Sequence, residues 1–252
     1  MTEPMFDLSG KTTLITGGSR GLGRAMANAF AAHGADVIIA SRKSDACETT
    51  AGEIAANHGV RTLPVACNVG NWDDCDALVE RSYAEFGRID VLVNNAGLSP
   101  SYPSLNEVSE ALWDKVIAVN VKGPFRLTAA IGSRMAADSG GSILNVSSIA
   151  AIRPNAHQLP YAAAKAGLNT LTEGFARAFA PTVRVNAIQA GPFLTDISKS
   201  WDLEAFAERA RTTIALGRGG EPDEVVGAAL YFASAASSFC TGAVLRLDGG
   251  VR

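Results

Sequence analysis

Two side chains that could move a proton stand four positions apart in the sequence, Tyr161 and Lys165. This spacing places both side chains on one face of a helix. A phenol has a pKa of about 10, and a nearby ammonium group lowers that value because it stabilises the phenolate. Tyr161 would then serve as general acid when a carbonyl is reduced, or as general base when an alcohol is oxidised. The pair alone is weak evidence, since a lysine that extends past a packed tyrosine gives the same pattern.

A hydroxyl group precedes this pair at the end of an apolar run, Ile143–Ser148. Ser148 lies thirteen residues before Tyr161. At the carboxyl end of a parallel strand its hydroxyl would face a ligand crevice and could stabilise charge that grows on a substrate oxygen. Serines at strand ends also cap turns, so a local role for Ser147 or Ser148 is the alternative.

A histidine, His157, lies between Ser148 and Tyr161. Histidine is a common acid or base at neutral pH. Because Tyr161 already supplies that function, we expect His157 at most to form part of a pocket wall.

Glycines follow the first predicted strand at the spacing G-x-x-x-G-x-G and open a helix. Such a loop lets the backbone approach a pyrophosphate and directs the amides of the helix N-terminus toward it. With 25 glycines in 252 residues the spacing could mark only a tight turn. Its position after the first strand nevertheless favours dinucleotide binding. The predicted phosphate-binding residues are Gly17, Ser19, Arg20, Gly21, Leu22 and Gly23.

The second predicted strand leads into Ser41, Arg42 and Lys43. A site selective for NAD usually has a carboxylate here, which holds the ribose 2′-hydroxyl and repels a 2′-phosphate. Arginines instead bind phosphate through a planar fork of donors, and Arg20 of the glycine loop adds a second one. The sequence therefore predicts NADP(H) rather than NAD(H). The alternative is that Arg42 and Lys43 only begin a solvated helix face.

These residues must be positioned by an alternation of short apolar runs and longer helical patterns. Nearly continuous apolar strands separated by helices predict a parallel sheet covered on both faces, the doubly wound α/β fold, with seven strands in one domain over residues 1–252. The predicted strands are Thr12–Thr16, Asp36–Ala40, Arg61–Ala66, Val91–Asn94, Gly141–Ser147, Val183–Ile188 and Ala243–Leu247. The predicted helices between them are Gly21–His33, Lys43–Asn57, Asn71–Phe86, Ser109–Ala137 and Tyr161–Ala180.

One segment, 191–220, breaks this alternation, with a predicted helix Trp201–Thr213 and no strand. A long insert after the sixth strand is a candidate lid over the ligand edge of the sheet. Its apolar residues Phe193, Leu194, Ile197 and Trp201 suggest an apolar substrate pocket.

The overall composition excludes several other classes of protein. The net charge is −3, so no basic field indicates binding to nucleic acid or to a membrane surface, and no apolar stretch is long enough for a spanning helix. The four cysteines, Cys47, Cys67, Cys75 and Cys240, have neither metal-ligand nor C-x-x-C spacing. We expect a cytoplasmic protein with reduced thiols, no metal and no disulfide.

Together, these motifs resemble those of the short-chain dehydrogenase/reductase family, in its form of roughly 250 residues. The resemblance spans nearly the whole chain, and its motifs occur in the family's order. They are Thr16–Gly23, Asn94–Gly97, Asn120, Ser148, Tyr161 with Lys165, and Asp248–Gly250.

The resemblance implies a catalytic tetrad of Asn120, Ser148, Tyr161 and Lys165. Asn120 would help to hold a water that relays protons to Lys165, Ser148 would position the substrate carbonyl, and Tyr161 would donate the proton. Lys165 would also hold the hydroxyls of the nicotinamide ribose.

Further cofactor contacts are implied by the same resemblance. Asn95, Ala96 and Gly97 would pack beside the adenosine part of the cofactor, and Thr195 would contact the nicotinamide carboxamide. The chain departs from the family at two places: Asn68-Val69 replaces Asp-Val near the adenine, and Ala190-Gly191 replaces Pro-Gly before the lid. The first departure would change the hydrogen bonds to the adenine but keep adenine binding. The second would change the path by which the loop with Thr195 enters the lid.

The implied reaction is hydride transfer between NADP(H) and a ketone or secondary alcohol, with 3-oxoacyl-carrier-protein reductases as the nearest type. Sugar dehydrogenases of the glucose or gluconate type are the alternative, and a regulator that binds NADP without turnover is a remote one. Small residues on one face of the Tyr161 helix, Ala163, Gly167, Thr170 and Gly174, suggest a subunit contact, and the resemblance implies a homotetramer. Leu168, Leu171, Phe175 and Phe179 of the same helix should pack on the sheet.

Overall fold

Seven short strands form the centre of the chain in a computed structural model, which describes residues 5–195, 198 and 202–252. They are β1 (Thr12–Thr16), β2 (Asp36–Ser41), β3 (Thr62–Ala66), β4 (Val91–Asn94), β5 (Gly141–Ser148), β6 (Val183–Ala190) and β7 (Val244–Leu247). All neighbours in the sheet pair in parallel, in the order β3-β2-β1-β4-β5-β6-β7. The predicted doubly wound α/β fold is confirmed.

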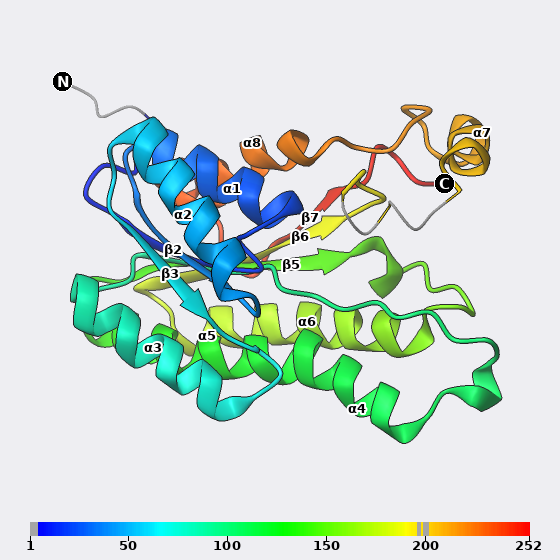
Figure 1. Cartoon of the computed structure of the whole chain (residues 1–252), viewed down its shortest axis with the longest axis horizontal. Helices are drawn as coiled ribbons and strands as arrows, with labels where there is room; N and C mark the ends of the chain where they lie inside the picture. Colours follow the sequence, from blue (N-terminus) through cyan, green and yellow to red (C-terminus); the bar gives the residue numbers. More distant parts are fainter. Residues whose placement is uncertain (1–4, 196–197, 199–201) are drawn as a thin grey trace.

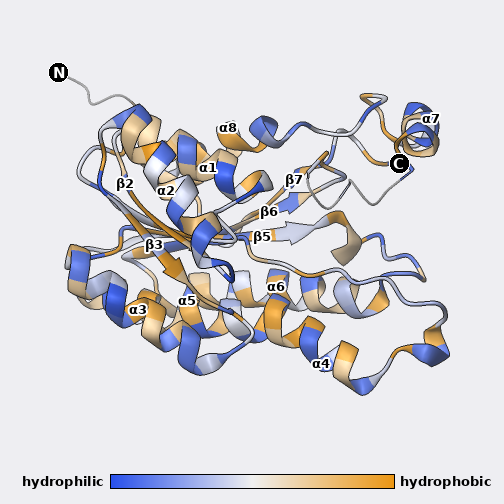
Figure 2. Cartoon of the chain, in the orientation of Figure 1, coloured by the Kyte–Doolittle hydropathy of each residue, from blue (hydrophilic) through white to orange (hydrophobic). Residues whose placement is uncertain are grey.

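Helices cover both faces of this sheet (Figure 1). The helices α1 (Gly21–Ala32), α2 (Ser44–His58) and α8 (Val226–Ala233) lie on one face, and α3 (Trp72–Phe86), α5 (Gly123–Ala137) and α6 (Leu159–Ala178) lie on the other. Each face has its own core of buried side chains, with Phe30 at the centre of one and Leu127 and Ile131 in the other. Blue and orange residues alternate along most of the helices in Figure 2, as expected where one stripe of a helix is buried.

Strand order reverses between β1 and β4, which are adjacent although three helices and two strands separate them in the sequence. In open α/β sheets the chain leaves such a pair of strands in opposite directions, which opens a crevice at their carboxyl ends. The glycine loop after β1 and the segment after β4 both begin at this point.

The predicted helix Ser109–Ala137 contains an interruption. It consists of α4 (Glu110–Ile117), a π-helical turn (Ala118–Lys122) and α5. The helix α8 was missed by the sequence analysis. Its residues are apolar on nearly every side, so it lacks the amphipathic period by which a surface helix is found.

The segment 191–220 leaves the sheet after β6, as predicted. Phe193 pairs with Gly220 at its base, and the helix α7 (Leu203–Thr213) begins two residues later than the predicted one. The end of the chain closes this region, because Val251 pairs with Ile214 and the Arg153 guanidinium donates to the Val251 carbonyl. The predicted lid residues Ile197 and Trp201 lie outside the described residues.

A buried chain of polar side chains ties the sheet to the helices beneath it. Asn94 of β4 donates to Thr128 of α5 and to Asn145 of β5, each at 2.9 Å. Asn145 in turn donates to Thr172 of α6 at 2.9 Å. Buried polar groups are costly unless they are paired, so this network fixes how α5 and α6 sit against β4 and β5.

The remaining expectations concern membranes and thiols. No helix in the described part of the chain has both the length and the apolar character to cross a bilayer. Cys47, Cys67 and Cys75 are buried and Cys240 is half-buried, and all four are free thiols.

Candidate active site

Tyr161 lies in the first turn of α6, at the carboxyl edge of the sheet. Pro160 precedes it at a position where a missing N–H costs nothing. The Tyr161 hydroxyl lies close enough to the side chain of Ser148, the last residue of β5, for Ser148 to lower its pKa. The structure thus brings together two predicted site residues that come from different elements.

Ser148 also has the local role that was its alternative interpretation. Its Oγ accepts a hydrogen bond from the Ala150 amide at 3.2 Å and caps the short helical turn Ile149–Ala151. A hydroxyl can accept one bond while it donates another, so the cap leaves the Ser148 hydroxyl able to donate to a ligand. The turn fixes the Ser148 hydroxyl on the side of Tyr161.

The prediction that the pKa of Tyr161 is lowered is wrong when only the protein's own groups act on the phenol. Burial raises the pKa of Tyr161, and the neighbouring side chain of Ser148 offsets this only in part. Desolvation disfavours the charged phenolate more than a single neutral hydroxyl stabilises it. The phenol therefore carries its proton through the neutral range, which suits proton donation to a substrate.

Lys165 is almost completely buried behind the phenol. Its Nζ donates to the Val146 carbonyl of β5 at 2.7 Å and lies 5.7 Å from the centre of the Tyr161 ring. Burial lowers the pKa of Lys165 to about 8, because an ammonium ion is poorly solvated there. The side chain can therefore exchange a proton near neutral pH, which an exposed lysine cannot do.

Asn120 occupies the π-helical turn between α4 and α5 and is fully buried. Its amide nitrogen donates to the carbonyls of Val116 and Leu98, at 2.9 and 2.8 Å, and its oxygen accepts from the Leu98 amide at 3.2 Å. Such π turns often occur at functional sites because they redirect a side chain. Here the turn directs Asn120 at the segment that follows β4.

Gly97 marks the place where these groups meet. A Cβ atom on Gly97 would lie 3.3 Å from the Asn120 oxygen and 3.7 Å from Lys165 Nζ. Asn120 and Lys165 therefore approach the same point, and the four predicted catalytic residues form one cluster.

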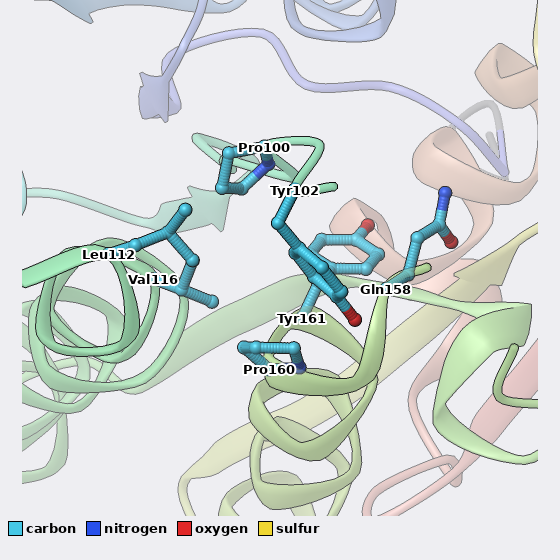
Figure 3. A pocket seen from close by; sticks show the side chains of 7 residues that line it. All are labelled: Pro100, Tyr102, Leu112, Val116, Gln158, Pro160 and Tyr161. Carbon is cyan, nitrogen blue, oxygen red and sulfur yellow. The ribbon is translucent and has the colours of Figure 1, made fainter. Parts of the chain in front are cut away.

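A small crevice opens beside the Tyr161 phenol (Figure 3). Its apolar wall comes from the segment after β4, from α4 and from the start of α6, through Pro100, Leu112, Val116 and Pro160. Tyr102 and Gln158 complete it. Sequence analysis missed these wall residues, because no motif marks them. Phe193 does not line this crevice: it packs against Gly220 and lines a second pocket at the base of the segment 191–220.

His157 is not among the residues that line this crevice. Its side chain is exposed, and the neighbouring residue Gln158 is the one that faces the space beside Tyr161. The predicted contribution of His157 to the pocket wall finds no support in the structure.

The glycine loop is packed too tightly for side chains. Gly17 has a φ of +66°, in the left-handed region that glycine tolerates best, and a Cβ on Gly23 would lie 2.2 Å from the Gly17 carbonyl oxygen. No side chain caps the N-terminus of α1, and no acidic residue lies in its first turn. Its free amides fit an anion such as a pyrophosphate.

Asn95 connects this loop to the segment after β4. Its amide donates to the carbonyls of Thr16 and Gly17 at 2.9 and 3.2 Å, while the Asn95 and Ala96 backbone amides both donate to the Thr16 hydroxyl. The residues predicted beside the adenosine thus adjoin the phosphate loop.

The carboxyl end of β2 has polar groups that could hold a 2′-phosphate. The Ser19 hydroxyl donates to Ser41 Oγ at 2.9 Å, and Ser41 Oγ lies 3.0 Å from the Cys47 sulfur. Arg20 and Arg42 are exposed, and neither forms an ion pair with any described residue. In the sequence each of these two arginines directly follows one of the two serines.

The remaining predicted cofactor residues lie around the same edge. Asn68 is exposed and its side chain accepts from the Gly70 amide, whereas Val69 is buried. Thr195 lies against Gly21, since a Cβ there would be 3.4 Å from the Thr195 side chain. Gly191 packs on Asp248 with no room for a side chain.

Comparisons with known proteins agree with this geometry. The family model described as enoyl-(acyl carrier protein) reductase matches residues 17–252. The chain is 39% identical to 3-oxoacyl-[acyl-carrier-protein] reductase from Thermotoga maritima, with 97% of this chain and 98% of the relative covered.

The chain belongs to the short-chain dehydrogenase/reductase family. Solved structures of the same fold include 3-oxoacyl (acyl-carrier-protein) reductase from Agrobacterium tumefaciens with NADP bound, with a TM-score of 0.92, 33% identity and coverage of 98% and 96%. L-sorbose reductase from Gluconobacter frateurii, in complex with NADPH and L-sorbose, has a TM-score of 0.93, 28% identity and coverage of 98% of both chains. The chain is an oxidoreductase that acts on alcohol or carbonyl groups with a nicotinamide cofactor.

The pKa values of Tyr161 and Lys165 predict the pH dependence of carbonyl reduction. Lys165, with a pKa of about 8, is an ammonium below that pH and an amine above it, while the raised pKa of Tyr161 keeps the phenol protonated. We expect kcat to be constant near pH 6.5 and to fall about tenfold per pH unit above about 8, as one proton is lost. Steady-state rates at saturating substrate check this. A rate that stays constant up to pH 9.5 would contradict it.

Proposed function

We propose that this chain is an NADP(H)-dependent reductase of ketones, of the 3-oxoacyl reductase type. The observation that carries the proposal is the Tyr161 hydroxyl, near Ser148 on the wall of an apolar crevice, with the buried Lys165 behind it. Sugar reduction is the second candidate, supported by the relative that binds L-sorbose. A regulator without turnover would have no need for this cluster.

A bound nicotinamide would supply the hydride, and the chain's residues would handle the proton. A substrate carbonyl oxygen accepts hydrogen bonds from Tyr161 and Ser148, which stabilise the negative charge that develops on it. Tyr161 donates its proton to this oxygen. The Lys165 ammonium then stabilises the phenolate and, with Asn120 near by, returns a proton to it.

The cofactor would lie along the carboxyl edge of the sheet. We assign its pyrophosphate to the glycine loop and the free amides of α1, and its adenine to the region of Asn68 and Val69. The nicotinamide end would reach Thr195 and Lys165. The segment 191–220, with α7, would close over it as a lid.

The first prediction concerns the proton donor. Tyr161→Phe should lower kcat for NADPH-dependent ketone reduction by about 10²- to 10⁴-fold, because it removes the general acid and leaves the ring in place. The substrates are acetoacetyl thioesters, small diketones and ketoses, followed by NADPH absorbance. NADPH binding by fluorescence should change little. Unchanged turnover in Tyr161→Phe would rule out the proposed role.

The second prediction concerns the cofactor. Arg42→Ala should weaken NADPH binding at least tenfold, since charged hydrogen bonds to phosphate contribute about 1.5–3 kcal/mol, and should leave NADH binding within about twofold. Fluorescence titration measures both. The control is Arg24→Ala on α1, whose guanidinium is already paired with Glu53. Tighter binding of NADH than of NADPH by the wild type would contradict the proposed preference for NADP(H).

We also propose a cytoplasmic homotetramer. The four free cysteines support a reducing compartment. On α6, Leu168 is buried, Leu171 is half-buried, and Phe175 and Phe179 pack at the edge of the core. The opposite face of α6 is open, and a Cβ on Gly174 would touch nothing. Beside α6, the ring centre of the exposed Phe125 of α5 lies 5.5 Å from that of Phe175, and Phe125 adds a further exposed apolar side chain.

Light scattering tests the proposed assembly. We expect a mass of about four times the 26.1 kDa of the chain, because a second exposed apolar surface on β7, at Leu245, would join two dimers. A monomeric mass at micromolar concentration would contradict the proposal.

A further inference from the structure

Gln158 stands out among the residues that line the crevice because its side chain has no partner. Its backbone N–H donates to Asn155 and its carbonyl accepts from Ala162, but its side-chain amide forms no hydrogen bond with any described residue. The residue occupies the N-cap position of α6. An N-cap side chain normally accepts a bond from the first turn of its helix, and this one does not.

Tyr102 explains why Gln158 is left free. The Tyr102 hydroxyl accepts from the amide of Leu159, the first residue of α6, at 2.9 Å and donates to the Ala156 carbonyl at 2.7 Å. A side chain from the segment after β4 thus caps the helix in place of Gln158. Tyr102 is buried, which holds this arrangement in place.

The free amide lies close to the reacting group. Gln158 and Tyr161 are three positions apart at the helix end, a spacing that brings side chains to one face with Cβ atoms about 5–6 Å apart. Figure 3 shows the Gln158 side chain beside the Tyr161 phenol, at the same end of α6. The other walls of the crevice are apolar apart from Tyr102, whose hydroxyl is already bonded to Ala156 and Leu159.

We infer that Gln158 is a specificity-determining residue that donates a hydrogen bond to a second oxygen of the substrate, one or two carbons from the carbonyl that Tyr161 protonates. The substrate class is therefore an α- or β-oxygenated ketone. This inference rests on the proposed carbonyl reduction. Both 3-oxoacyl groups and ketoses belong to this class, so it describes what the two candidate functions share.

The second oxygen is a neutral one, a carbonyl or a hydroxyl. Among the described residues that line the crevice, none is Arg, Lys or His. A carboxylate moved from water into an apolar site without a cation would be unfavourable, whereas one amide can satisfy a neutral oxygen. The crevice therefore disfavours 2-oxo acids.

The test compares two ketones of similar shape, butane-2,3-dione and 3-methylbutan-2-one; in the latter a CH–CH3 group replaces the second C=O. The value of kcat/KM with NADPH is measured for each, and the ratio of the two cancels any general loss of activity. Gln158→Leu should lower this ratio about three- to tenfold, the effect of one neutral hydrogen bond, with the plain ketone little changed. If the plain ketone turns over too slowly, its inhibition constant against the dione replaces kcat/KM.

His157→Leu is the matched control. It removes a polar side chain from the same loop, one residue away and outside the crevice, and should leave the ratio within about twofold. Thermal unfolding followed by circular dichroism should show both variants folded, because the Gln158 side chain makes no bond that the fold would lose.

The possible outcomes distinguish this inference from the proposed carbonyl reduction on which it rests. A ratio that Gln158→Leu leaves unchanged, in an enzyme that reduces ketones, overturns the role of Gln158 and keeps carbonyl reduction. The inference is also overturned if His157→Leu lowers the ratio of the two kcat/KM values as much as Gln158→Leu does. The effect would then come from a disturbed loop and not from the Gln158 amide. Failure of the wild type to consume NADPH with any ketone overturns both.

Discussion

The burial of one ammonium group, that of Lys165, is the constraint on which the rest of the site depends. Its Nζ has the Val146 carbonyl as acceptor and the Tyr161 ring near by, and burial lowers its pKa to about 8. A buried cation is unfavourable unless its surroundings are fixed and polar. The end of β5, the turn of α6 and the segment at Gly97 must therefore keep their places, and all three meet at this nitrogen.

Two groups of hydrogen bonds hold those elements. Below the site, the buried chain from Asn94 through Asn145 to Thr172 ties β4 and β5 to α6. Above it, Asn120 binds Leu98, and Tyr102 caps α6, so the segment after β4 is fixed at two points. The same segment begins with Asn95, which holds the glycine loop. The catalytic helix and the phosphate loop are thus connected through one short stretch of chain.

This connection explains how the site divides its tasks. Tyr161 is partly buried and Lys165 almost completely buried, and desolvation keeps the phenol protonated and lowers the pKa of Lys165 to about 8. The cationic residues Arg20 and Arg42 remain in solvent at the other end of the edge, where a phosphate can reach them. Gln158 lies between the apolar wall and the phenol, and it is available for a ligand only because Tyr102 has taken over its usual bond.

The sequence by itself determined what local pattern can express. The strands, the glycine loop, the pair on one helical turn and the strand-end serine could all be predicted, because backbone periodicity and residue spacing are short-range properties. Tertiary structure alone decided the rest. Burial decides that the pKa of Tyr161 is raised and not lowered. The crevice wall combines Pro100, Leu112 and Val116 from two separate segments. The side-chain amide of Gln158 is free because of Tyr102, which lies more than fifty positions away in the sequence. Such properties arise from contacts between distant parts of the chain, which spacing does not encode.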